Sequence, residues 1–215
     1  MRGESPSILC RMERSQDSYR TMDRRNFGLA RFLTFSCEQR LPLFGSAALR
    51  DYFRSKLAES QQEHDFKLLA WVLMPEHVHL LIVPGSTPVT RLLSSLKTKV
   101  SMGILTRWKQ IDAPILPKLR RPDGAARFWQ TGGGFDRNVR DRGELVETIT
   151  YIHNNPVKRG LVLRPIDWEW SSAAVYHQRD TRPPSVDLTP ESQLLEDICR
   201  IETRKWGYKP IEPAE

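Results

Sequence analysis

Residues 71–83 read Trp71-Val-Leu-Met-Pro75-Glu-His77-Val-His79-Leu-Leu-Ile-Val83, two apolar runs separated by a proline and a glutamate. Proline fixes its own φ angle and lacks a backbone N–H, so it suits a chain reversal and not a strand ladder. The stretch therefore predicts two neighbouring β-strands joined by a tight turn at Pro75 and Glu76.

Alternation along the second strand places both histidines on one face. His77 and His79 point the same way and Val78 points the opposite way, because successive side chains of a strand alternate. Both faces continue apolar beyond the histidines, which favours a central strand covered on both sides. Two imidazoles side by side can hold one divalent ion or one phosphate, but they can also be a pair of hydrogen-bonded edge histidines. The spacing alone leaves both interpretations open.

Composition limits the class of protein. The chain has 215 residues, 39% of them hydrophobic, and a mean hydropathy of −0.50, which indicates one domain of ordinary size with appendages. No apolar run approaches the roughly 20 residues that a membrane span requires, and we expect no membrane association. The N-terminus lacks the apolar region of a secretory signal. The cysteines are Cys10, Cys37 and Cys199, an odd number without a C-x-x-C pair, which favours a reducing cytoplasm.

The charge is concentrated in the middle of the chain. The net charge is +7, and residues 91–164 hold 15 Lys and Arg against 6 Asp and Glu. The rest of the chain is close to balanced. A basic segment on a balanced protein suits a phosphate backbone, although a solvated basic face has the same composition.

The order of predicted elements indicates a fold class. A strand within residues 31–44 precedes a helix that Ser46 caps, and the two strands around the histidines follow. A second helix covers residues 89–108, with Arg91, Lys97 and Lys99 in water, and a bent fourth strand covers residues 127–139. This β-α-β-β-α-β order predicts an α+β fold, a ferredoxin-like sandwich with an antiparallel sheet and extra C-terminal helices.

We expect three segments along the chain. Residues 1–26 are predicted to be a flexible polar arm, residues 27–180 the main domain, and residues 181–215 a linker with a C-terminal helix and tail. The C-terminal helix is predicted to open at Thr189-Pro190-Glu191. It can dock on the main domain or on a second subunit, and the sequence does not choose.

A third predicted helix, from Arg142 to Asn155, carries a tyrosine off its apolar stripe. Tyr151 lies about 200° from Ile149, on the polar side, whereas a tyrosine placed only for packing belongs on the stripe. Asn155 follows Tyr151 by four residues and shares its face. Pro156 disfavours helical geometry at Asn155, so we expect distortion at this end. For His153 a surface or hydrogen-bonded role is expected, not metal binding.

Several motifs in order resemble one known family. Across about residues 27–176 the chain resembles the REP-associated tyrosine transposases, which belong to the single-tyrosine HUH nucleases; REP denotes repetitive extragenic palindromes. The matching segments are Met74-Pro-Glu-His-Val-His-Leu-Leu81, Phe128-Trp-Gln130, Gly132-Gly-Gly-Phe-Asp-Arg-Asn138, Tyr151-Ile-His-Asn-Asn-Pro-Val-Lys-Arg-Gly-Leu-Val162 and Trp168-Glu-Trp-Ser-Ser172.

The resemblance implies an activity and roles for particular residues. It implies cleavage and strand transfer of single-stranded DNA at hairpins through a 5′-phosphotyrosine, with Tyr151 as nucleophile. His77 and His79 would bind Mg²⁺ or Mn²⁺, and Asn155 would complete the metal site. Glu76 and Phe135 stand where relatives commonly have Asn and Tyr, neither at a catalytic position of the family.

The expected partners are single-stranded DNA and DNA hairpins, bound by a monomer or a homodimer. Backbone contacts are predicted for basic residues of the middle segment: Arg91, Lys97, Lys99, Arg137, Arg140, Lys158 and Arg159. Two other classes of protein are considered. One is a DNA-hairpin-binding protein of the same fold without catalysis, and the other is a metallohydrolase that adds further His or Asp ligands to the H-x-H pair.

Overall fold

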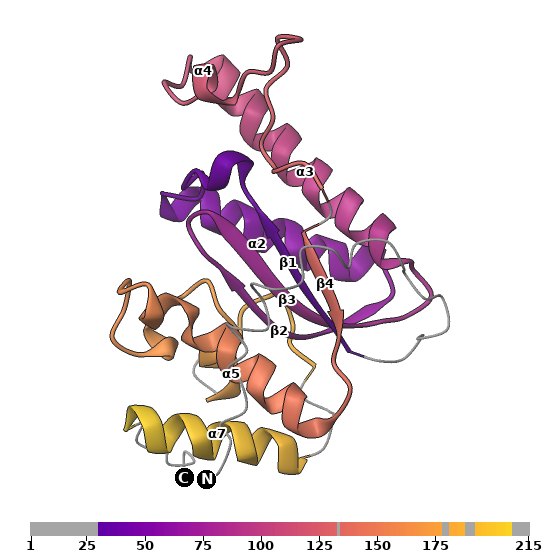
Figure 1. Ribbon diagram of the computed structural model, residues 1–215, viewed down its shortest axis with the longest axis vertical. Helices are drawn as coiled ribbons and strands as arrows, with labels where there is room; N and C mark the ends of the chain where they lie inside the picture. The colour runs from indigo at the N-terminus through magenta and orange to yellow at the C-terminus, as the bar shows by residue number, and fades with distance from the viewer. Residues whose placement is uncertain (1–29, 133, 178–180, 188–191, 208–215) are drawn as a thin grey trace, which may run out of the picture.

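The computed structural model describes residues 30–132, 134–177, 181–187 and 192–207 (Figure 1). The predicted N-terminal arm and the predicted helix start at residues 189–191 lie outside these ranges. The elements are β1 Arg31–Ser36, η1 Glu38–Arg40, α2 Ala47–Glu63, β2 Phe66–Leu73, β3 His77–Pro84, α3 Val89–Gln110, α4 Leu116–Leu119, β4 Phe135–Asn138, α5 Arg142–Lys158, η2 Pro165–Asp167, α6 Ala173–Tyr176 and α7 Ser192–Trp206. No helix in these ranges has the length and apolar character to cross a membrane.

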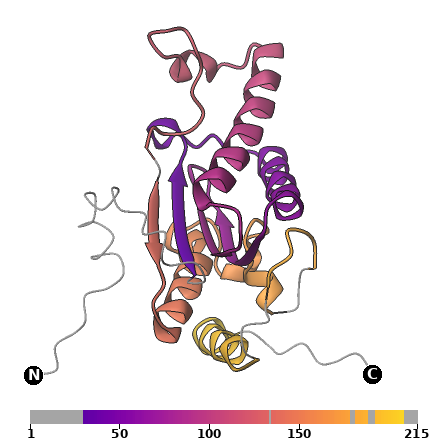
Figure 2. The same cartoon turned by 90° about the vertical axis from the view of Figure 1, so that its right-hand side faces the viewer.

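Four strands form one antiparallel sheet in the order β2-β3-β1-β4. Helices α2 and α3 lie on one side of this sheet and α5 on the other, with α7 beyond α5 (Figures 1 and 2). The split arrangement, in which β1 and β2 are parallel with β3 between them, is that of the ferredoxin-like sandwich. The predicted fold class is therefore confirmed.

The strand that carries the histidines lies inside the sheet. His79 pairs with Thr34 of β1 and with Val72 of β2, and His77 pairs with Ser36. Every residue from 77 to 82 is buried, as expected for a central strand with both faces covered. The alternative of hydrogen-bonded edge histidines is wrong about the edge, because β3 has a neighbour on each side, but the two rings do contact each other through their Nε2 atoms.

The fourth strand bends where glycine is required. Trp129 bridges to Cys37 just after β1, and β4 then pairs with β1 from Thr34 back to Arg31. Gly134 lies between these pairings with φ +83°, and a Cβ atom added there would sit 1.8 Å from the carbonyl oxygen of Thr34. The bend thus depends on a residue without a side chain.

One lysine of α3 departs from its predicted position in water. Arg91 is exposed and Lys99 pairs with Glu63, but the ammonium of Lys97 lies 5.7 Å from the ring centroid of Phe35 and 5.9 Å from that of Trp129. Burial lowers the pKa of Lys97 below its ordinary value. The expectation failed because a long side chain can fold its stem back over neighbouring aromatic rings.

Helix α5 continues past the expected distortion. It runs through Pro156 to Lys158, and Arg159 N–H donates to the carbonyl of Asn155 at 3.1 Å. The helix therefore extends three residues beyond its predicted end at Asn155. The side of α5 that the sequence shows as polar is also not a solvent face, since Thr148 and Asn155 are both buried. Helix α5 therefore packs both against the sheet and against α7.

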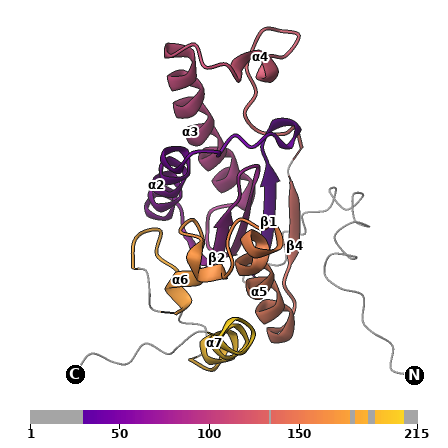
Figure 3. The ribbon, with the colours of Figure 1, turned by 90° about the vertical axis from the view of Figure 1, so that its left-hand side faces the viewer.

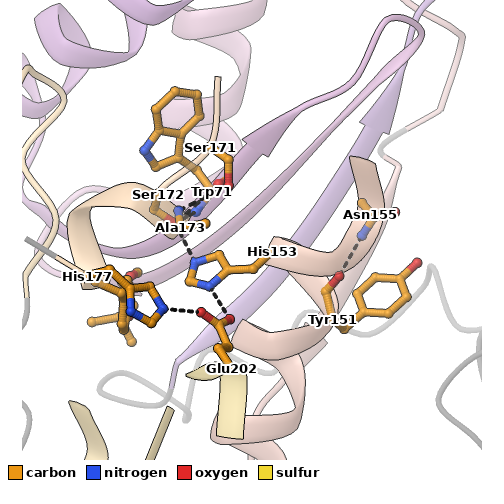
Figure 4. A network of polar contacts seen from close by, with 11 residues as sticks. Trp71, Tyr151, His153, Asn155, Ser171, Ser172, Ala173, His177 and Glu202 are labelled. Atoms are coloured by element: carbon orange, nitrogen blue, oxygen red, sulfur yellow. Dashed lines mark hydrogen bonds and ion pairs between the residues drawn. The ribbon is translucent and has the colours of Figure 1, made fainter. Parts of the chain in front are cut away.

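A buried polar network joins α7 to α5 (Figure 4). The Glu202 carboxylate accepts hydrogen bonds from His153 Nδ1 at 2.7 Å and from His177 Nε2 at 2.9 Å. His153 Nε2 lies 2.9 Å from Ser172 Oγ, which accepts from the backbone N–H of Trp71 at 2.9 Å. His153 thus has the hydrogen-bonded role expected for it, but it is buried and not on the surface.

This network determines where the C-terminal helix binds. Glu202, His153 and Ser172 are fully buried, and a charge in such a place destabilises the fold unless it is paired and hydrogen-bonded. Ile198 of α7 is fully buried beside them. Of the two docking places that the sequence left open, the helix occupies the main domain of its own chain (Figure 3).

Replacing Gly134 should test the bend. We expect Gly134→Ala to lower the free energy of unfolding by about 3 kcal/mol or more, because it adds a backbone clash to an unfavourable φ. Gly132→Ala is the matched control, since Gly132 also has a positive φ but has open space around its Cβ position. It should cost about 1 kcal/mol in urea denaturation. An equal decrease in the free energy of unfolding in the two variants would contradict the predicted clash at Gly134.

Replacing Glu202 should show the stability that its charge provides. Contacts with His153 and His177 outweigh burial and lower the pKa of Glu202 from 4.5 to about 2. A depressed carboxyl pKa stabilises the fold above the unfolded pKa, and this contribution is lost as pH falls from about 4.5 towards 2. We expect Glu202→Gln to cost about 3 kcal/mol at neutral pH. In urea titrations, the difference in free energy of unfolding between the variant and the parent should shrink as the pH is lowered through that range. A difference that does not change with pH would contradict a charged Glu202.

Candidate active site

The two histidines of β3 face each other through their Nε2 atoms, which lie 3.0 Å apart. Their other nitrogens are held from outside: His77 Nδ1 lies 3.1 Å from Glu76 Oε1, and His79 Nδ1 lies 2.7 Å from Thr34 Oγ1. The Glu76 carboxylate can only accept, so it favours the His77 tautomer with the proton on Nδ1 and the lone pair on Nε2; the Thr34 hydroxyl can accept from His79 Nδ1 or donate to it. Two imidazole nitrogens that face each other at this distance can share a proton, and they can also bind one cation between them.

Burial favours the neutral, ligating form of the second histidine. His79 is 2% exposed, and burial, followed by the neighbouring His77, lowers the pKa of His79 well below its ordinary range. A hydrogen bond with the side chain of Asn155 opposes this shift. A neutral imidazole is the form that binds a metal ion.

Tyr151 lies beside this pair. Its ring centroid is 5.5 Å from that of His79 and 6.0 Å from that of Phe32, both in edge contact. Burial raises the pKa of the Tyr151 phenol, while a hydrogen bond with Asn155 and the positive charge of Arg40 oppose that rise. The tyrosine is therefore off the apolar stripe, as predicted, but it faces the sheet and the histidines.

Asn155 connects the tyrosine with the histidines. Its side chain is buried, its Nδ2 donates to the Tyr151 carbonyl at 2.8 Å, and it interacts with both His79 and the Tyr151 phenol. The structure thus brings together all four residues to which the resemblance gave a role: His77, His79, Tyr151 and Asn155. Their roles in catalysis and metal binding stay predictions.

Three further residues belong to the site and had no predicted role. Thr34 and Glu76 hold the outer nitrogens of the histidines, and Arg40 affects the pKa of both His79 and Tyr151. Hydrogen bonding from His77 keeps the pKa of Glu76 below its usual value despite burial. Glu76 directly precedes the first histidine, and that adjacency is the one signal in the sequence. Nothing local points to Thr34 or Arg40.

The predicted DNA contacts do not form one surface. Lys158 lies at the site, its ammonium 4.9 Å from the Tyr151 ring centroid, and Arg159 Nη2 is 3.1 Å from Glu76 Oε1. Arg137 of β4 pairs with Glu144 of α5, on the same side of the sheet. The other four predicted DNA-contact residues lie in two further places. Arg140 is just before the start of α5, and Arg91, Lys97 and Lys99 are on α3, on the opposite side of the sheet.

The described residues offer no larger set of metal ligands. Within them, no three or more His, Cys, Asp or Glu side chains gather in a group suited to a metal ion. The metallohydrolase interpretation requires such further ligands, and this part of the chain does not supply them. The histidine pair with the Asn155 amide is the set that the fold brings together.

Comparisons with known proteins agree with this geometry. A REP-associated tyrosine transposase of Haemophilus influenzae is 28% identical over 155 residues, 70% of this chain and 85% of the relative. Another from Escherichia coli is 24% identical over 126 residues, 55% of this chain and 61% of the relative. A solved REP-associated tyrosine transposase bound to a REP hairpin has a TM-score of 0.56 at 21% identity, covering 80% of this chain and 95% of that chain, which shows a shared fold.

The family match spans the sheet and the four residues to which the resemblance gave a role. The family described as "Transposase IS200 like" matches residues 28–155, more than half of the chain. The matched segment begins just before β1 and ends at Asn155, so it includes the sheet, the histidine pair and Tyr151. The resemblance expected from the sequence is thereby confirmed, and the chain belongs to the IS200-like transposase family.

Proposed function

We propose that the protein is a metal-dependent endonuclease and strand-transferase for single-stranded DNA, a transposase that acts at repetitive palindromic hairpins through a 5′-phosphotyrosine intermediate. The observation that carries the proposal is the meeting of three features in one site: the facing Nε2 atoms of His77 and His79, the Asn155 amide and the Tyr151 phenol. Membership in the transposase family supports it, as does the fold shared with a REP-associated transposase bound to a REP hairpin.

The site residues fit a divalent cation with neutral ligands. A phosphodiester is anionic and resists attack by an anion, so Mg²⁺ or Mn²⁺ held by His77, His79 and Asn155 would supply polarisation of the phosphate oxygens. Two imidazoles and an amide add no charge, which preserves the full charge of the ion. Nitrogen ligands suit Mn²⁺ better than Mg²⁺.

Tyr151 would attack the phosphorus atom. Its Oη forms a bond to phosphorus as the bond from phosphorus to the 3′ oxygen breaks. The phenol loses its proton in this step, and the leaving 3′ oxygen takes up a proton. The products are a 5′-phosphotyrosine and a strand with a free 3′-hydroxyl. Attack by a 3′-hydroxyl reverses the step, so the strand can be rejoined without a nucleotide cofactor. Asn155 and Arg40 favour the phenolate, since both lower the pKa that burial raises.

The position of Tyr151 favours single-stranded substrate. The tyrosine comes from α5 and the histidines from β3, so the two elements would hold one phosphate from two sides. A second DNA strand would obstruct this approach. A single strand flanking a folded hairpin fits the arrangement, and the hairpin backbone then meets basic residues outside the site.

Removing the phenolic oxygen should abolish adduct formation. We expect Tyr151→Phe to bind a hairpin oligonucleotide with a single-stranded flank but to form no covalent protein–DNA adduct, measured as a slower band in a denaturing gel. Tyr52→Phe is the matched control, because Tyr52 lies on α2, where its hydroxyl meets the Lys99 carbonyl, and this variant should keep the adduct. The parent should leave the fully paired duplex uncut. Adduct formation by Tyr151→Phe would refute the assigned nucleophile, and no adduct from the parent would favour the silent DNA-binding alternative.

Removing either imidazole should stop cleavage. We expect His77→Ala and His79→Ala to lose activity and Mn²⁺ binding, measured by calorimetry, whereas Asn155→Ala should be milder because water can replace one neutral ligand. His64→Ala, at the end of α2, should behave as the parent. A chelator should inactivate the parent, and Mn²⁺ or Mg²⁺ should restore it. Full activity in chelator would contradict the metal requirement.

A further inference from the structure

A charge cluster surrounds the buried carboxylate of Glu76. One oxygen, Oε1, lies 3.1 Å from His77 Nδ1, 3.1 Å from Arg159 Nη2 and 3.8 Å from Arg40 Nη2. The Glu76 side chain is 6% exposed, whereas those of Arg40 and Arg159 are 57% and 55% exposed. The Glu76 carboxylate is therefore the buried part of the cluster, and the two arginine side chains are the part exposed to solvent.

The two arginines reach Glu76 from different parts of the fold. Arg159 caps the C-terminal end of α5, eight residues after Tyr151. Arg40 ends η1, the turn that follows β1. One therefore comes from the helix of the nucleophile, and the other from beyond the strand that supports His79. Both therefore approach the same carboxylate oxygen, next to His77.

The backbone holds Arg40 in an unfavourable conformation. Gln39 and Arg40 both have φ +52°, a left-handed conformation that costs a residue with a side chain about 1 kcal/mol. Two backbone hydrogen bonds fix the turn from both sides: Cys37 N–H donates to the Glu76 carbonyl and Glu38 N–H to the Phe128 carbonyl, each at 2.8 Å. Such strain is maintained by the surrounding structure and is frequent where a side chain has to be presented to a ligand.

The cluster keeps an excess of positive charge beside the nucleophile. Two guanidinium groups face one carboxylate, so one positive charge is left uncompensated among these three. The charge of Arg40 lowers the pKa of both the Tyr151 phenol and His79, which places it within electrostatic range of both. The contacts that Glu76 makes with Arg159 Nη2 and Arg40 Nη2 each involve one guanidinium nitrogen, and a guanidinium has five N–H donors in all.

We propose that Arg40 and Arg159 form a two-sided clamp for a phosphate of the single-stranded DNA at the reacting bond, and that Glu76 is the residue that positions the clamp. This proposal rests on the proposed function. A guanidinium fork matches the oxygens of a phosphate and binds them with charge-assisted hydrogen bonds. Glu76 does not touch the DNA. Its carboxylate fixes the spacing of the arginines and, by accepting from His77 Nδ1, directs the His77 Nε2 lone pair towards His79.

Binding without metal tests the clamp separately from catalysis. The probe is a fluorescent single-stranded oligonucleotide that carries the hairpin and its cleavable flank, bound to the Tyr151→Phe protein in EDTA. Arg40→Ala and Arg159→Ala should each raise Kd on the order of tenfold and reduce the slope of log Kd against log salt by about 0.7. Arg40→Lys should keep the slope and lose part of the affinity, because lysine keeps the charge without the fork.

A lysine at a distance is the matched control for loss of one charge. Lys67 of β2 pairs with Val83, at the opposite end of β3 from His77, and its side chain is 64% exposed. Lys67→Ala should keep the parent's Kd and salt slope. Parent-like Kd and slope in both Arg40→Ala and Arg159→Ala would overturn the clamp, while adduct formation that depends on Tyr151 would leave the proposed function standing. A parent that neither binds DNA nor forms the adduct would overturn both.

Glu76→Gln separates positioning from binding. The amide oxygen can still accept from His77 Nδ1, but the charge that holds the arginines is gone. We expect Kd in EDTA to stay equal or to fall, since a negative charge leaves the site. With the tyrosine restored, the rate of adduct formation at saturating DNA and Mn²⁺ should fall on the order of tenfold because the clamp loses its spacing. An unchanged rate at saturation would overturn the positioning role of Glu76.

Discussion

Two histidine nitrogens that face each other across 3.0 Å, inside a sheet, constrain much of this structure. Each ring has a hydrogen-bond partner on its other nitrogen, and the two partners come from different places: Thr34 from the neighbouring strand β1, and Glu76 from the turn before β3. An edge strand, open on one side, would expose these polar contacts to water. The central position of β3 is thus as much a condition of the site as of the fold.

Patterns of short range predicted most of the fold. Alternation in residues 71–83 indicated a buried strand, and Ser46 indicated a helix start that the structure shows as a cap accepting from Leu49. Helical periodicity also placed Tyr151 off the apolar stripe of α5. It did not show what covers the other face, because a helical projection separates faces without telling solvent from sheet. Burial of Thr148 and Asn155 comes from the packing of α5 on β2 and β3.

Contacts between distant segments were beyond prediction from one sequence. Glu202 contacts His153, which is 49 residues away in the sequence. Arg40 contacts Glu76 from a turn with a left-handed backbone, and no glycine in the sequence indicates that conformation. Lys97 failed as a solvated charge for the same reason, since the rings that cover it come from β1 and from the loop before β4. In each case the tertiary fold determines the contact partner, and the sequence next to the two residues does not indicate that they are in contact.

The buried network at His153 and the site at Tyr151 are two sides of one helix. His153 follows Tyr151 by two residues and precedes Asn155 by two, about 200° of rotation in each case, so it points away from both. On its own side it is fixed by Glu202 of α7 and by Ser172, which is itself bonded to Trp71 of β2. A rotation of α5 that moved the tyrosine from His79 would have to break a fully buried, charge-assisted contact on the far side. The C-terminal helix, outside the family match, therefore restrains the rotation of the helix that presents the nucleophile.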